Sequence, residues 1–391
     1  MNEVLNMKQN NQFYRTTGPI ILSVFIIYLT MGMALGTLPM FILNKLNFSS
    51  FIVGIVIGLQ SLSTLLTRAY SGKLSDTKGP KASKSIGVIL VAAAAVIYTL
   101  AIASTQFPIL ALVLLLFARL LHGVSESLLV TGALAWGIGL VGHEKSGKVM
   151  TWNGIAMYAG IAFGAPLSIW IAKYTDIKYT FIIMIILSLL SWLSTFKLPT
   201  IHIDKNHVRT PFHKVIGDIA KQGVSLGLSS IAFGCISSFI ALLFMEKNWG
   251  DASLAFTTFG ICYILPRLIF SSFPDKYGGF IITLVSLLIE IFGQIVIGFA
   301  STKIMAVIGC GLTGIGFSLI YPSLGVLIIK KVSPQMRATA LGAYSAFFDL
   351  SLALTVPLAG LIAGNFNYQA VYFFGAVNCL LAFLLILYRR K

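Results

Sequence analysis

Charged residues are scarce in this chain. Asp, Glu, Lys and Arg make up 10% of its 391 residues, against about 25% in a typical soluble domain. Hydrophobic residues make up 57%, and the mean hydropathy is +0.90. Because this apolar surplus continues from end to end, a soluble globular protein is excluded. The composition indicates an integral membrane protein whose spans are helical, since lipid offers the peptide groups no hydrogen-bond partner.

Acidic residues are the scarcer charge: 12 Asp and Glu stand against 28 Lys and Arg, a formal net charge of +16. In a soluble protein this excess would suggest nucleic-acid binding. Here most bases lie in the links between apolar runs, on the same side of the membrane as the N-terminus. The positive-inside rule explains this distribution. We therefore expect both termini in the cytoplasm, a cell (plasma or inner) membrane location and no nucleic-acid partner. The bases on that side include Lys73, Lys78, Lys81, Lys205, Arg209, Lys330, Lys331 and 389–391; those opposite are Lys45, Lys173, Lys178, Lys247 and Lys303.

Catalytic and cofactor signatures are absent from the sequence. It contains no H-E-x-x-H, G-x-S-x-G or C-x-x-C motif, and Gly142–Val149 nearly matches a phosphate-binding loop but ends in Val where Ser or Thr should meet the metal. We therefore expect no enzyme, no ATP site, no metal and no cofactor, so that any transport draws on an ion gradient. The four cysteines lie inside apolar runs without metal-ligand spacing: Cys235, Cys262, Cys310 and Cys379.

Twelve apolar runs are long enough to span a bilayer, which takes about 20 residues. The longest polar link, 198–215, predicts a cytoplasmic connector between a six-helix half at 1–197 and another at 216–391. The sequence thus predicts an all-α membrane protein with twelve transmembrane helices. The runs are 18–42, 50–70, 84–104, 108–130, 151–174, 179–197, 216–244, 253–272, 280–300, 304–329, 338–363 and 368–388.

The two halves share residue spacings. Gly123–Pro166 and Gly314–Pro357 each cover a helix, a loop and the next helix over the same separation. Six helices is an even number, so both copies face the same way, which predicts parallel repeats related by an axis along the membrane normal. A polar triplet repeats too, as Arg68, Asp76, Gly79 and as Arg267, Asp275, Gly278.

The first triplet lies in Gly72-Lys-Leu-Ser-Asp76-Thr-Lys-Gly79-Pro-Lys81. This segment resembles the loop signature of the major facilitator superfamily, G-x-L-[AS]-D-[RK]-x-G-[RK]-[RK], with Thr77 and Pro80 at basic positions. The resemblance implies twelve helices around a central cavity, monomeric function and a cytoplasmic latch that includes Asp76. From the residues alone, Asp76 can cap the next helix and pair with Arg68, or the charges only anchor the topology. The expected gate residues are Gly72, Asp76, Gly79, Lys81 and Arg68, with Asp275 and Arg267 in the second copy.

The fourth span carries Arg119, His122 and Glu126 at i, i+3 and i+7, on one helical face. A charge in mid-span costs at least about 2.5–3.5 kcal/mol, so this face should meet protein or water. The run resembles the superfamily's helix-4 signature, although His122 departs from its Gln, and the resemblance implies that Arg119 takes part in proton coupling. A permanent buried Arg–Glu pair is the alternative.

The fifth span contains Gly160, Gly164 and Pro166. The glycines permit close helix approach and the proline can bend the helix. This resembles the helix-5 signature of the superfamily's antiporters, which implies export by proton antiport; close packing alone is the alternative. The superfamily's helix arrangement implies that Asp349 faces the cavity. Glu290 would either pair with a neighbouring helix or have a functional role. Further cavity candidates are Tyr28, Gly32, Asn153, Tyr158, Tyr321, Pro322 and Tyr344.

The sequence therefore predicts a secondary transporter that exports a small organic molecule against proton entry. Glu126 or Asp349 would exchange the proton, Arg119 would tune it, and His122 is a further candidate. A proton-coupled uptake symporter for a sugar or organic anion is the alternative, and a non-transporting membrane sensor or scaffold is a remote one. Drugs, sugars and siderophores all remain open as substrates.

Overall fold

A computed structural model of the chain describes residues 2–142, 145–201, 213–270, 273–332 and 337–388. Every regular element in these ranges is an α-helix. Eleven helices are long and apolar enough to cross a membrane, and the apolar helix Ser253–Ile269 is shorter. Each of the twelve predicted spans corresponds to one of these helices. The predicted connector lies largely outside the described residues, because 202–212 belong to one of the gaps.

The helices fall into two groups along the chain. The first group is α1 (Asn2–Asn44), α2 (Ser50–Lys78), α3 (Pro80–Ala103), α4 (Pro108–Val141), α5 (Ser146–Tyr174) and α6 (Ile177–Phe196). The second is α7 (His213–Glu246), α8 (Ser253–Ile269), α9 (Phe273–Lys276), α10 (Gly279–Gly298), α11 (Lys303–Lys331), α12 (Arg337–Asn365) and α13 (Tyr368–Leu387).

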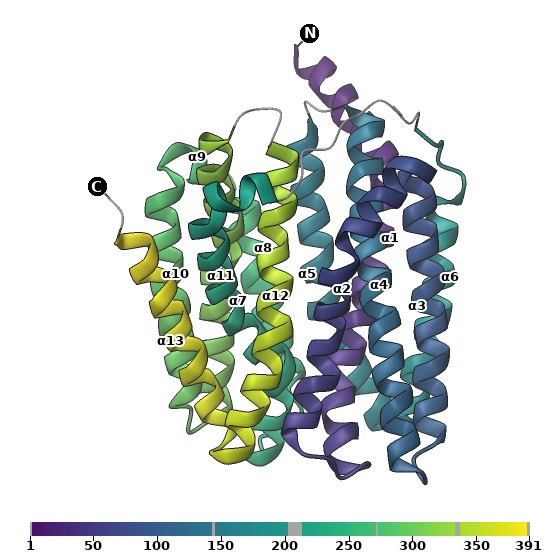
Figure 1. The fold of residues 1–391 in the computed structure, drawn as a ribbon, viewed down its shortest axis with the longest axis vertical. Coiled ribbons are helices and arrows are strands. Elements are labelled where there is room, and N and C mark those ends of the chain that lie inside the picture. Colours follow the sequence, from purple (N-terminus) through teal and green to yellow (C-terminus); the bar gives the residue numbers. More distant parts are fainter. Residues whose placement is uncertain (1, 143–144, 202–212, 271–272, 333–336, 389–391) are drawn as a thin grey trace.

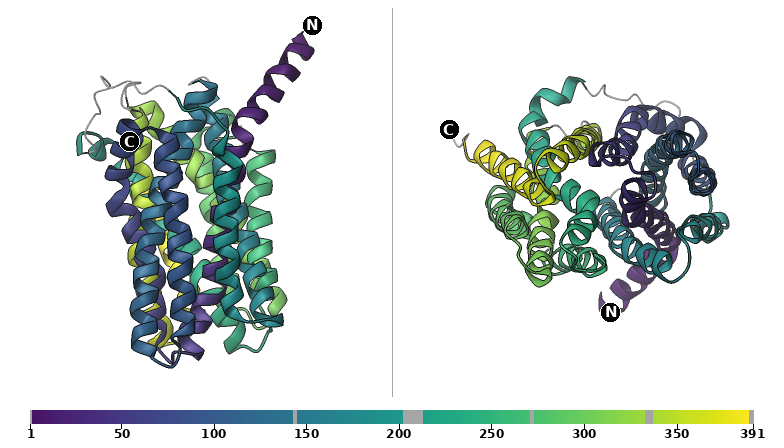
Figure 2. Two further views of the ribbon diagram at one scale, coloured as in Figure 1. Left: turned by 90° about the vertical axis from the view of Figure 1, so that its right-hand side faces the viewer. Right: turned by 90° about the horizontal axis from the view of Figure 1, so that it is seen from below.

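The two groups form two bundles that stand side by side (Figure 1). We call α1–α6 the N-terminal bundle and α7–α13 the C-terminal bundle. The start of α1 and the end of α13 lie at the same end of the molecule, which we call the terminal end, and α1 projects beyond the bundle there (Figure 2). The opposite end, where α1 leads into α2, is called the far end.

The turn between α2 and α3 is tighter than the predicted polar loop. Nothing from Lys73 to Lys78 breaks a helix, so α2 continues through Asp76, and Gly79 alone separates it from α3. Gly79 has φ 95°, a conformation that glycine adopts without strain, and Pro80 opens α3 at a position where its missing N–H is no loss. The repeat-related Gly278 has φ 88° before α10.

The duplicated spacings correspond to a duplicated contact. A Cβ at Gly123 of α4 would collide with the Gln60 carbonyl of α2, and a Cβ at Gly314 of α11 would lie 2.5 Å from the Phe259 carbonyl of α8. The equivalent glycine therefore brings the equivalent helix pair close together in each bundle.

Two helix pairs carry most of the interface between the bundles, α2 with α12 and α5 with α8. Near the far end, Gly54 packs on Val356 and Pro357, and the hydroxyls of Ser50 and Tyr368 lie 3.0 Å apart. Further contacts at this end are Asn44 Nδ2 to Met245 Sδ at 3.0 Å and the ion pair Lys173–Asp251 at 4.0 Å.

Candidate functional site

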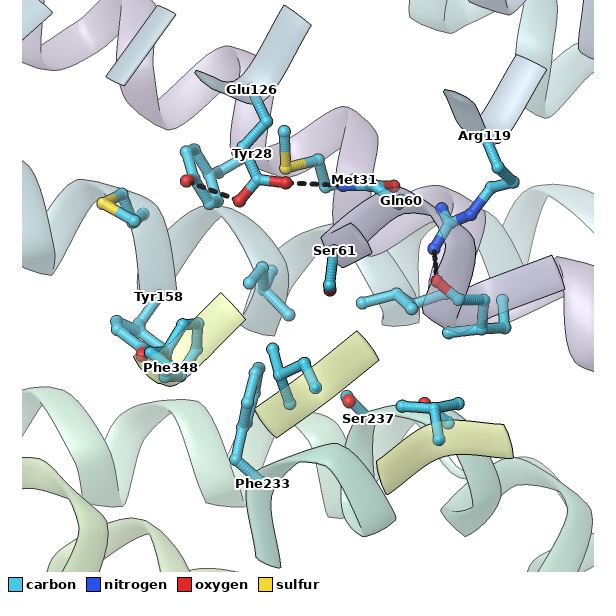
Figure 3. Close-up of a pocket in the computed structure, with 17 residues that line it drawn as sticks. Tyr28, Met31, Gln60, Ser61, Arg119, Glu126, Tyr158, Phe233, Ser237 and Phe348 are labelled. Atoms are coloured by element: carbon cyan, nitrogen blue, oxygen red, sulfur yellow. Dashed lines mark hydrogen bonds between the residues drawn. The ribbon is translucent and has the colours of Figure 1, made fainter. Parts of the chain in front are cut away.

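A small cavity lies between the bundles, part-way along their length (Figure 3). Its volume is about 80 Å³. Ligand pockets typically hold about 300–1,000 Å³, so a substrate of ordinary size would require the bundles to separate further. The lining residues are Tyr28, Met31, Leu35, Ile57, Gln60, Ser61, Arg119, Glu126, Met157, Tyr158, Ile161, Phe233, Ser237, Ser238, Phe348, Leu352 and Val356.

Glu126 is the acid of this lining, and neutral donors hold it. Tyr28 OH donates to Oε1 at 3.0 Å, and Gln60 Nε2 donates to Oε2 at 2.9 Å (Figure 3). Thr64 Oγ1 also donates to Oε2, at 3.2 Å. Glu126 forms no ion pair with any described residue. These neutral donors orient the carboxyl at the cavity.

The next turn of α2 carries an ion pair that joins the bundles. Gln60, Thr64 and Arg68 are spaced by four residues and share one helical face. Arg68 Nε donates to Asp349 Oδ2 of α12, and the Asp349 side chain is 4% exposed. We expected Asp349 to face the cavity, but it is not among the lining residues. Its side chain turns toward α2, while its neighbour Phe348 lines the cavity.

Arg119 does not pair with Glu126. Its Nε and Nη2 donate to the backbone carbonyls of Val56 and Ile57 at 3.2 and 3.0 Å, and Nη1 has no partner among the described residues. The two residues are seven positions apart, about 10 Å along the helix axis, and carbonyls of α2 lie within closer reach. The predicted face is therefore polar, but its charges remain separate.

His122 lies beside this face and away from the cavity. It is fully buried, with Nδ1 3.4 Å from Tyr98 OH and Nε2 without a partner among the described residues. The ring is edge-on to Tyr98, at 6.0 Å between centroids. Its surroundings are those of a packed core side chain.

Some of the predicted gate residues bond within their own bundle, and others contact the opposite bundle. Lys81 Nζ donates to the carbonyls of Phe196 and Leu198 at 2.8 and 2.7 Å, so it binds the end of α6 in its own bundle. Gly72 is buried, and Asp76 is exposed in the last turn of α2. Arg68 bonds to the other bundle at Asp349, two turns from Asp76. Asp275 belongs to α9, and its side chain lies outside the described residues.

Arg267, the repeat-related counterpart of Arg68, also lies at the bundle interface. Its Nε donates to the Ser318 carbonyl at 3.1 Å, and its guanidinium lies 4.7 Å from the Tyr263 ring centroid and 5.9 Å from that of Tyr158 in α5. A Cβ at Gly154 of α5 would collide with it. Each arginine of the repeat therefore contacts the opposite bundle.

The predicted α5 glycines pack closely on α1. A Cβ at Gly160 would lie 2.7 Å from the Phe25 carbonyl and one at Gly164 would collide with the Leu29 carbonyl, while Gly32 of α1 meets Ile161. Pro166 lies inside α5 without ending it. These contacts fix α1 and α5, which bring Tyr28 and Tyr158 to the cavity.

Five of the seven further cavity candidates lie outside the lining: Gly32, Asn153, Tyr321, Pro322 and Tyr344. Asn153 Nδ2 donates to Met157 Sδ at 3.2 Å. Tyr321 OH lies 2.7 Å from Ser345 Oγ, and Tyr344 OH donates to the Tyr321 carbonyl at 3.2 Å. The two tyrosines belong to a packed cluster within the C-terminal bundle.

Sequence reasoning missed several lining residues. Gln60 lines the cavity and Thr64 contacts Glu126. Both had a usable signal, since they continue the helical face of Arg68. The phenylalanines at the cavity had no such signal. Phe233 stacks with Phe317 and Phe348, at 5.7 and 6.2 Å between ring centroids, and nothing in the sequence distinguishes these rings from lipid-facing ones.

Comparison with known proteins shows the family to which this chain belongs. The family model of the Major Facilitator Superfamily matches residues 20–224 and 223–391. An uncharacterised MFS-type transporter of Salmonella typhimurium is 36% identical over 359 residues, covering 92% of each chain. One of Burkholderia pseudomallei is 37% identical over 378 residues, covering 95% of this chain and 92% of its own.

Solved structures agree in fold. A mutant of the nucleoside transporter NupG aligns with a TM-score of 0.75 at 15% identity, covering 96% of this chain and all of its own. The human organic anion transporter MFSD10 aligns with a TM-score of 0.72 at 15% identity, covering 96% of this chain and 99% of its own. The chain is a multi-pass membrane transporter, not an enzyme, and it belongs to the major facilitator superfamily.

Proposed function

We propose that this transporter exports a small organic molecule in exchange for protons. The observation that carries the proposal is the Arg68–Asp349 ion pair between the bundles, next to Glu126 at the cavity. A carboxyl buried at an interface has two usable states, ionised and paired or protonated and released. Such a pair links proton binding to bundle separation.

The proposed cycle uses the two acids in different ways. Protonation of Asp349 removes the charge that holds Arg68, so the bundles separate at the terminal end. Glu126 exchanges a proton at the cavity, because its partners Tyr28, Gln60 and Thr64 are neutral. Arg119 also lines this cavity and is the cation proposed to tune that exchange.

The cavity supports a substrate with ionised groups and an apolar body. Arg119 Nη1 is an unpartnered buried donor among the described residues and suits a carboxylate. Glu126 suits an ammonium group, and Phe233 with Phe348 offers ring faces. Polar molecules of either charge are therefore better candidates than a neutral hydrocarbon.

The direction of transport is proposed from α5. Gly160, Gly164 and Pro166 resemble the antiporter signature, which supports export over uptake symport. We further propose that the protein acts as a monomer, that residues 1–197 and 216–391 are its two halves, and that both termini are cytoplasmic because bases concentrate at that end. A reporter fused to the C-terminus would test the orientation.

The deciding experiment uses purified protein in liposomes with an internal pH-sensitive dye. Gradients of organic anions, organic cations and sugars are imposed, and wild type is compared with Glu126→Gln and Asp349→Asn. Proton movement opposite to substrate, lost in either variant, supports the proposal. Movement in the same direction supports symport, and unaltered coupling in both variants contradicts the assigned proton sites. His122→Asn is the matched control on α4 and is expected to keep coupling.

A further inference from the structure

A second buried carboxyl lies outside the transport path. Glu290 stands in the middle of α10 and is fully buried. The cavity lining includes no residue of α10, α11 or α13. Ser229 Oγ of α7 donates to Glu290 Oε2 at 2.7 Å, while Oε1 is buried and has no partner among the described residues. The proposed export cycle makes no use of this group.

Gln294 lies one turn further along α10, and its side chain also has a buried oxygen without a hydrogen-bond partner among the described residues. Its Nε2 donates to Thr313 Oγ1 of α11 at 3.2 Å, and its Oε1 is buried without a partner among the described residues. Residues at i and i+4 of a helix are neighbours, with about 5–6 Å between their Cβ atoms. Two buried oxygen atoms without a partner among the described residues thus belong to neighbouring side chains on one face of α10.

No positive charge among the described side chains compensates Glu290. Besides Ser229, α7, α11 and α13 present Gly316 and the thiol of Cys379, which interacts with Glu290 and whose Sγ lies 4.0 Å from the Ser229 carbonyl. Charged residues with described side chains on these helices lie two or more turns away. They are Asp218, Lys221, Glu246, Lys303, Lys330 and Lys331, and Lys221 Nζ donates to the Ile386 carbonyl. An ionised, unpaired carboxylate would be strongly disfavoured here, because burial removes its hydration.

We propose that Glu290 and Gln294 form a second proton-binding site, built into the C-terminal bundle and separate from the cavity. One proton on Glu290 Oε1, donated to Gln294 Oε1, supplies both unpartnered oxygens and removes the charge. The two side chains then hold α10 against α7 and α11. This proton stays bound while the bundles move, in contrast to the protons exchanged at the cavity.

The test is infrared spectroscopy of the purified full-length transporter, since a protonated carboxyl has a C=O stretch distinct from that of a carboxylate. Wild type is expected to show a band near neutral pH that Glu290→Gln lacks and that added substrate does not shift. Gln294→Leu, which removes the acceptor, is expected to move the band to higher frequency. Glu126→Gln, the matched control at the cavity, leaves this band in place.

A stability measurement adds an independent readout. Glu290→Gln keeps the shape of the neutral acid, so its melting temperature should equal that of wild type at neutral pH and exceed it at alkaline pH, where wild type loses the proton. Identical infrared spectra for wild type and Glu290→Gln would overturn the proposal. Loss of the band on adding Na⁺ would also overturn it, because the bound cation would then be sodium.

Discussion

At the scale of single residues, the molecule places its few buried charges in contrasting surroundings. Asp349 has a cationic partner in the other bundle, Glu126 has neutral donors only, and Arg119 rests on backbone carbonyls. A buried pair is weak evidence for stability, yet removing one partner leaves an uncompensated charge. The Arg68–Asp349 pair is therefore better explained by a role in switching between conformations than by a role in stabilising the fold.

Arg68→Ala is expected to destabilise the protein by about 3 kcal/mol, the lower end for a broken buried pair because the Arg68 side chain is 21% exposed. Adding Asp349→Asn should restore much of the loss, since it removes the stranded charge. Thermal unfolding of purified protein measures both. Lys173→Ala, which breaks an exposed pair, is the control and should change stability by no more than about 1 kcal/mol. A double variant no more stable than Arg68→Ala would contradict this account.

At the scale of helices, small residues decide which backbones touch. Gly32 of α1 packs on Ile161 of α5, and Gly160 and Gly164 of α5 pack on Leu29 of α1, so this seam has backbone atoms on both sides. Without a hydrophobic force between helices in lipid, such close packing supplies much of the association. The seam fixes the helices that carry Tyr28 and Tyr158, so packing and cavity shape are coupled.

Gly32→Ala is expected to lower stability by about 1–3 kcal/mol, because its Cβ would lie 2.5 Å from the Ile161 carbonyl and neither backbone can yield easily. Gly18→Ala is the matched control on the same helix, since a Cβ at Gly18 meets nothing within 4 Å. Thermal unfolding and the yield of folded protein compare the two. Equal behaviour of both variants would show that the seam tolerates a side chain.

At the scale of the whole molecule, two layers of contacts enclose the cavity along the bundle interface. Ser50, Tyr368, Asn44 and Met245 meet near the far end, whereas Arg68 and Asp349 meet on the side of the terminal end. Alternating access requires one layer to open while the other holds. Each layer thus predicts a position at which a covalent link would stop transport.

Asn44→Cys combined with Met245→Cys is expected to arrest transport when a short thiol crosslinker is applied, because Asn44 Nδ2 and Met245 Sδ lie 3.0 Å apart. The background first replaces Cys235, Cys262, Cys310 and Cys379. Liposome uptake before and after reduction measures the effect, and reduction should restore transport. Each single cysteine variant is the control, and unchanged transport in the linked protein would argue against opening at the far end.

The local sequence was sufficient for the helices and their repetition. Charge scarcity and the length of the apolar runs predicted twelve spans, because a bilayer tolerates only hydrogen-bonded helices of that length. The repeated Gly and Arg spacings predicted parallel repeats, and Gly123 and Gly314 make equivalent helix contacts in the two bundles. Helical periodicity also placed Arg119 and Glu126 on one face, and both line the cavity.

Only the tertiary structure decided which polar groups meet. Arg68 and Asp349 are 281 residues apart and belong to different bundles, so no local pattern relates them. The sequence suggested Asp76 for Arg68 and left an Arg119–Glu126 pair open, but helix continuation carries Asp76 two turns away and α2 carbonyls occupy Arg119. Periodicity determines the face that a residue occupies; the packing of distant helices determines its partner.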